Sequence, residues 1–221
     1  MGKTDGLENP WTRLPFDPPF VLPEDSRVLG RHPAAAHDLL STGCRSPTSD
    51  PDAPVVLLTL HPGGRTRDAD FGPRYVEERR RQLSSKAPFR SSPRSSRQRP
   101  ATSIWAARLR RVVERVGVDR VINGLFCIQW FPYQSMQFRT LPELLPSQHY
   151  SFALCRRAIR EKREVVILRS RALWLRAVAE LSRADFIELR NHRSPYLSPK
   201  NMGEAAFARI VARLNASPES R

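Results

Sequence analysis

The sequence predicts an α/β fold, a three-layer αβα sandwich around a four-stranded, mostly parallel sheet. Two observations predict it. Short continuous apolar runs, such as Val55-Val56-Leu57-Leu58, are typical of strands buried on both faces. Segments with apolar residues at helical spacing separate these runs, and strands that alternate with helices form parallel sheets covered on both faces. We expect one domain over residues 51–216, a proline-rich N-terminal arm over 1–50 that packs on it, and a tail over 217–221.

Four segments are expected to be strands. They are residues 55–60, 121–131, 165–168 and 186–189. The first is closed by Pro62-Gly63-Gly64 and the second by Pro132, which break a strand. Helices are expected over 101–116 (capped near Thr102 or Ser103 and ended by Gly117), from Ser147 through Ile159, around Trp174 to Val178, and over 204–214.

Two stretches lack the periodicity of a packed element. Prolines of the arm interleave with aromatic residues, so we expect an extended segment pinned by its rings, since proline blocks helix. Residues 79–100 are rich in arginine and serine and contain no acid, which predicts a loop. That loop is either a solvated insertion or a segment that lies on phosphates.

The charge balance indicates a polyanionic partner. The chain has 37 Lys+Arg against 22 Asp+Glu, a net charge of +15, although an arginine bias can also reflect genome composition. A basic surface attracts nucleic acid and gains from counterion release. No apolar run approaches the roughly 18 residues of a membrane span, and the N-terminus does not resemble a secretory signal. We therefore expect a cytoplasmic protein without a membrane partner.

Cysteine usage argues against a metal or a disulfide framework. The three cysteines, Cys44, Cys127 and Cys155, lie far apart and form no Cys-x-x-Cys pair. An odd count without ligand spacing indicates reduced thiols rather than a zinc or iron–sulfur site.

Residues that follow the strands are the first candidates for a site, because ligands of parallel sheets bind at the carboxyl ends of the strands. After the first strand come His61 and then Pro62, Gly63, Gly64 and Arg65. Two glycines let the backbone approach an anion or a sugar–phosphate closely. His61 would then be a base or a hydrogen-bond donor at the strand tip.

Two further segments combine polar and aromatic residues. Gln129 and Trp130 lead the segment after the second strand, where a carboxamide can pair with a base edge and rings can stack, or the rings can simply belong to the core. After the fourth strand, the pair Tyr196-Leu197 lies within a basic loop. An apolar tip in such a loop is typical of a wedge that enters a base stack.

These segments together resemble the uracil-DNA glycosylase superfamily over roughly residues 50–215. Leu60-His61-Pro62-Gly63 is similar to the Asn-Pro-Gly water-positioning motif of its mismatch-specific branch, with His for Asn. Residues 192–198 resemble its His-Pro-Ser-Pro-Leu-Ser motif, with Arg for Pro and one additional residue. The segment 131–135 is similar to a group of bacterial glycosylase-like proteins.

The resemblance implies a mechanism without metal or cofactor. Members flip a nucleotide out of the duplex and hydrolyse its N-glycosidic bond, which leaves an abasic site. By motif position, His192 would donate to the departing base, a contribution of about 3–4 kcal/mol for one good donor. His61 would hold the attacking water, Asp68 could assist it, and Phe71 would stack on the flipped base.

The resemblance also implies contacts to the base and to the DNA. Candidate substrate-binding residues are Pro62, Gly63, Phe71, Gln129, Trp130, Tyr133 and Asn191. Candidate DNA-binding residues are Gly64, Arg65, Ser135, Arg193, Ser194, Pro195, Tyr196, Leu197, Ser198 and Lys200.

Because both motifs deviate, we expect the substrate to be double-stranded DNA that contains a modified pyrimidine, such as the glucosylated hydroxymethylcytosine of phage DNA. Two alternatives stay open: repair of uracil or another deaminated base, and a catalytically silent DNA-binding protein. A bifunctional lyase is disfavoured, since Lys200 is the only lysine near a motif. No obligate protein partner is expected.

Overall fold

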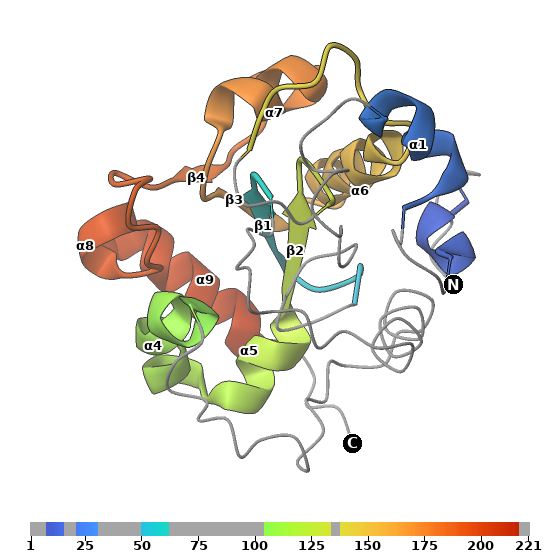
Figure 1. The fold of residues 1–221 in the computed structure, drawn as a ribbon. Coiled ribbons are helices and arrows are strands. Elements are labelled where there is room, and N and C mark those ends of the chain that lie inside the picture. The colour runs from blue at the N-terminus through green and yellow to red at the C-terminus, as the bar shows by residue number, and fades with distance from the viewer. Residues whose placement is uncertain (1–7, 16–20, 31–49, 62–103, 134–137, 217–221) are drawn as a thin grey trace.

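The residues that the structure describes contain a four-stranded, all-parallel sheet at their centre (Figure 1). The structure is a computed structural model that describes residues 8–15, 21–30, 50–61, 104–133 and 138–216. The expected loop over 79–100, the tail over 217–221 and Cys44 lie outside these residues.

The sheet has the order β2-β1-β3-β4. Its strands are β1 (Val55–Thr59), β2 (Leu125–Gln129), β3 (Glu164–Ile167) and β4 (Ile187–Glu188). In β1, Val55 is in register with Leu125 of β2 on one side and with Glu164 of β3 on the other. The predicted α/β class with a parallel sheet is confirmed.

Helices cover both faces of the sheet (Figure 1). On one face lie α4 (Ile104–Val116), α5 (Val118–Gly124), α8 (Pro199–Met202) and α9 (Glu204–Ala216). On the other lie α1 (Pro23–Leu29), α6 (Gln148–Arg160), α7 (Arg171–Ala177) and the 3-10 helix η3 (Ala179–Arg183). Side chains alternate along a strand. Val55 and Leu57 therefore belong to the core under α4, α5, α8 and α9, whereas Val56 and Leu58 belong to the core under α1, α6, α7 and η3.

The second strand is shorter than expected. Residues 118–124 form α5, so the prediction of a strand from residue 121 is wrong at its start. A short apolar run does not by itself distinguish strand from helix. Gly124 ends α5 against α9, where a Cβ would overlap the side chain of Leu214. A larger residue at this position would therefore displace the buried side chain of Leu214.

The described parts of the N-terminal arm contain helices, contrary to the expected extended conformation. The 3-10 helix η1 spans Pro10–Arg13, and α1 begins at Pro23. Each proline occupies the first position of its helix, where no backbone N–H is needed, so it does not block the helix. Trp11 and Leu22 belong to the same buried core as Val56.

A buried carboxylate ties α1 to the rest of the domain. Tyr133 donates from its hydroxyl to Asp25 (2.7 Å) and accepts from the backbone N–H of Leu22 (3.0 Å). Ser147 donates its backbone N–H to the other oxygen of Asp25 (3.0 Å). Burial, followed by the negative charge of Asp25, raises the pKa of Tyr133, so the phenol stays a donor.

Two free thiols are buried in the described part of the chain, at Cys127 and Cys155. Burial raises the pKa of the Cys155 thiol to about 12, which keeps it neutral.

Among the described helices, none combines the length and the apolar character that a membrane crossing requires.

We expect Tyr133→Phe to lower the free energy of unfolding by about 1–3 kcal/mol, because Asp25 loses a donor that water cannot replace. Urea denaturation measures this loss. Tyr150→Phe, a half-buried tyrosine of α6, is the matched control, with an expected loss within about 0.5 kcal/mol. Equal losses for both variants would contradict a structural role for the Asp25 network.

Candidate functional site

The carboxyl edge of the sheet is where the chain order favours a ligand. Of the described helices between β1 and β2, both α4 and α5 lie on one face, whereas α7, between β3 and β4, lies on the other. The change of direction therefore falls between the neighbouring strands β1 and β3. In open parallel sheets ligands bind at such a point. His61 comes after β1, Arg169 after β3 and His192 after β4.

His192 is held between two oxygen acceptors. Its Nε2 lies 3.3 Å from a carboxylate oxygen of Glu188, and its Nδ1 lies 3.4 Å from the carbonyl oxygen of Leu168. Each ring nitrogen therefore faces one oxygen acceptor. Arg171 lies 3.1 Å from the other oxygen of Glu188, so this carboxylate is shared. The imidazole therefore reaches the end of β3, although it follows β4, and it is 41% exposed.

His61 lies beside an aromatic cluster at the ends of β1 and β2. Its half-buried ring is 5.9 Å from the ring of Phe138, with an angle of 46° between the planes. Phe138 also packs edgewise on Trp130 (5.9 Å) and Phe131 (6.0 Å). Sequence reasoning missed Phe138, and the available signal was an aromatic residue shortly after the segment 131–135.

The structure brings both histidines to one edge of the sheet, on either side of β3. Two strand spacings separate the backbones of β1 and β4, about 10 Å. His61 faces the aromatic cluster and His192 faces Glu188 and Leu168, so the two rings have different neighbours.

The candidates at the end of β2 are buried. The hydroxyl of Thr59 donates to the side-chain carbonyl of Gln129, which is only 6% exposed, and Trp130 packs against Phe138 and Phe152. Tyr133 has no exposed surface, and its hydroxyl donates a hydrogen bond to Asp25. The expected substrate contact of Tyr133 is therefore corrected to a structural role, because α1 covers this ring. For Trp130, core packing is what the structure shows.

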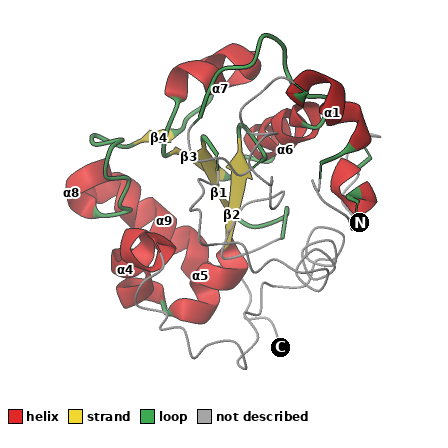
Figure 2. Cartoon of the chain, viewed as in Figure 1, coloured by secondary structure: helices red, strands yellow, loops and turns green. Residues whose placement is uncertain are grey.

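The loop after β4, green in Figure 2, is built by local hydrogen bonds. The side-chain oxygen of Asn191 accepts from the backbone N–H groups of Arg193 (3.0 Å) and Ser194 (3.2 Å), which makes an Asx turn. The candidate Asn191 is thus exposed at a turn that its own side chain stabilises, and Pro195 is buried behind it.

The apolar tip of this loop splits into an inward and an outward residue. Leu197 is fully buried in the core of Phe207 and Ile210, and its backbone N–H donates to the carbonyl of Arg108 (2.9 Å). The expectation that Leu197 contacts DNA as a wedge is corrected, because its side chain fills this core. Tyr196 is 47% exposed and is the residue that can reach a ligand.

Asn201 is a positioning residue that sequence reasoning missed. Its side-chain nitrogen donates to the carbonyls of Ser194 (3.1 Å) and Tyr196 (3.0 Å), and its oxygen accepts from the N–H of Asn191 (2.7 Å). One buried amide thus closes the whole loop. No sequence pattern distinguishes this asparagine from an exposed one.

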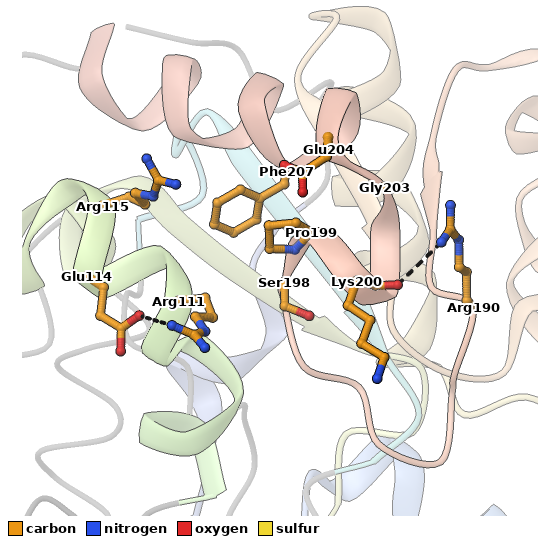
Figure 3. A pocket seen from close by; sticks show the side chains of 10 residues that line it. All are labelled: Arg111, Glu114, Arg115, Arg190, Ser198, Pro199, Lys200, Gly203, Glu204 and Phe207. Carbon is orange, nitrogen blue, oxygen red and sulfur yellow. Dashed lines mark hydrogen bonds and ion pairs between the residues drawn. The ribbon is translucent and has the colours of Figure 1, made fainter.

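Among the remaining candidates, Arg193, Ser194 and Lys200 are exposed, and Ser198 and Lys200 line an open groove (Figure 3). Seven candidates lie outside the described residues: Pro62, Gly63, Gly64, Arg65, Asp68, Phe71 and Ser135. Over the part of the chain that is described, no group of three His, Cys, Asp or Glu side chains could hold a metal ion.

No family model matches the chain, and no curated protein or solved structure is significantly similar to it. Any function assigned to this chain therefore depends on its own residues.

We expect Leu197→Ala to cost about 2–5 kcal/mol of unfolding free energy, because it empties a core position, and Tyr196→Ala to cost within about 0.5 kcal/mol. Chemical denaturation of the two variants measures the difference. An equal cost at both positions would show that the loop does not bury one residue and expose the other.

Proposed function

We propose that this protein is a DNA glycosylase with a uracil-DNA glycosylase-like fold, which excises a modified pyrimidine from double-stranded DNA and leaves an abasic site. One observation carries the proposal: His61 and His192 stand at the same carboxyl edge of a parallel sheet, on either side of β3. Their order along the chain also agrees with the superfamily that the sequence resembles.

In the proposed reaction, the bond between C1′ of the sugar and the base nitrogen breaks, and the base leaves with the electron pair. His192 donates a hydrogen bond to the carbonyl of the departing base and stabilises its negative charge. Glu188 holds the ring through Nε2. The longer contact, from Nδ1 to the carbonyl of Leu168, is the one that the base replaces.

His61 acts on the water side of the same bond. As the sugar becomes oxocarbenium-like, a water oxygen adds to C1′, and His61 accepts the proton that this water loses. The ring of Phe138 packs beside His61 and restrains its imidazole. The half-buried ring of Phe138 also offers an apolar surface to a nucleobase.

Charge and shape support DNA as the substrate. The net charge of +15 favours a phosphate backbone. Exposed Arg193 lies on the loop that carries His192, and exposed Lys200 lies in α8, which follows this loop. Tyr196, exposed on that loop, would fill the gap left by a flipped nucleotide. The deviation of both motifs from their usual residues favours a modified base, such as glucosylated hydroxymethylcytosine, over uracil.

The test is an abasic-site assay on duplexes that contain uracil, hydroxymethylcytosine or glucosylated hydroxymethylcytosine. We expect alkali-labile sites on modified cytosine. His192→Ala should slow single-turnover excision about 100- to 1,000-fold, and His61→Ala about 100-fold or more. His149→Ala, an exposed histidine on α6, is the matched control and should leave the rate unchanged.

Other outcomes would overturn the proposal. Excision of uracil alone would indicate a repair glycosylase. A second candidate function, a DNA-binding protein without catalysis, is favoured by the contact of Glu188 with His192, which occupies a ring nitrogen. That candidate predicts salt-sensitive DNA binding that His192→Ala does not change, and no abasic sites on any of the three substrates.

A further inference from the structure

An open groove runs between α4 and the segment 190–207. It has two lobes, of about 740 and 660 Å³, which share Arg111 and Ser198. Figure 3 shows Arg111 and Arg115 on α4 on one side and Ser198 and Lys200 on the other, with Phe207 between them. The backbone hydrogen bond from Leu197 to Arg108 fixes the two walls relative to each other.

The groove carries a large excess of positive charge. Of the described residues that line it, six are basic and two are acidic; they are Arg108, Arg110, Arg111, Arg115, Arg190 and Lys200, against Glu114 and Glu204. Glu114 forms ion pairs with Arg110 (3.7 Å) and Arg111 (3.0 Å). Within the described part of the chain, Arg115, Arg190 and Lys200 have no ion-pair partner.

The spacing of the arginines on α4 suits a regular polyanion. Arg108, Arg111 and Arg115 lie at i, i+3 and i+7, which is one face of a helix. They span about 10 Å along the helix axis, so their guanidinium groups form a row that a chain of phosphates can follow.

One end of the groove reaches the loop that carries His192, because Tyr196 and Leu197 line it. Arg108 stacks over Trp105 (5.3 Å), and burial and then the charge of Arg169 lower its pKa. Arg169 follows β3 and donates to the carbonyl of Arg193 (3.1 Å), while its Nε is buried without a hydrogen-bond partner among the described residues. The positive charge of Arg169 that acts on Arg108 adds to the positive potential at this end of the groove, which favours an anion there.

We propose that this groove binds the phosphodiester backbone of the DNA strand that flanks the reacting nucleotide, with the arginines of α4 on successive phosphates. The inference depends on the proposed function for the identity of the ligand as DNA, and it does not depend on base excision.

The test compares two triple variants that remove the same charge. The groove variant is Arg111→Gln/Arg115→Gln/Arg190→Gln, and the control is Arg27→Gln/Arg176→Gln/Arg183→Gln, three exposed arginines on α1, α7 and η3 across the sheet. Fluorescence anisotropy measures binding of an unmodified duplex of about 25 base pairs over a series of salt concentrations.

We expect the groove variant to lose about 2 to 3 in the slope of log affinity against log salt, and about 100-fold in affinity at 0.1 M salt. The control should stay within about 3-fold of the unmodified protein. Equal losses in both variants would show that only total charge matters and would overturn the inference. Competition with a heparin fragment and with unlabelled duplex gives a second test. If heparin displaces the labelled duplex at a lower concentration than unlabelled duplex does, the inference is overturned in favour of a sulfated glycan.

The two proposals fail in different ways. If the unmodified protein makes abasic sites while the groove variant binds DNA normally, only the groove proposal fails. If no substrate is excised while the groove variant still loses binding, only the glycosylase proposal fails.

Discussion

The burial of β1 between two parallel neighbours is the constraint on which the rest of the structure depends. All of its residues, Val55–Thr59, are buried, and it pairs with β2 on one edge and β3 on the other. Its alternate side chains enter two different cores. Because one strand belongs to both cores, neither helical layer can shift alone, since close-packed interiors transmit displacement. The carboxyl ends of the strands are therefore fixed relative to one another, and so are the residues that follow them.

Most of the described polar groups at these strand ends form hydrogen bonds within the protein. The carbonyl of Thr59 accepts from the indole N–H of Trp174 (3.0 Å), and its hydroxyl donates to Gln129. The carboxamide of Gln129 is thereby turned toward the protein. Groups that can meet a ligand come from one step further along the chain, at His61 and in the loop after β4. Gln129 is therefore occupied within the protein, whereas His61 and His192 follow β1 and β4 at positions with exposed surface.

The loop after β4 joins two surfaces that are otherwise separate. On one side it presents His192 to the end of β3, and on the other it forms a wall of the groove with Lys200. The buried amide of Asn201 holds both parts in one conformation. In the proposed function, this one segment would contact both a base and the backbone of the same DNA strand, with Tyr196 between the two contacts.

The sequence by itself determined the parallel α/β architecture and the place of both histidines, because continuous apolar runs and helical periodicity report burial directly. It did not determine α5, since an apolar run such as Val121-Ile122 suits either element. It also could not orient Leu197, because a leucine in a basic loop looks the same whether it fills a core or leaves it. Only the tertiary structure decided those cases, and only it joined the arginines of α4 to Lys200. Net charge gives the amount of a charge excess, whereas its position depends on contacts between residues far apart in the chain.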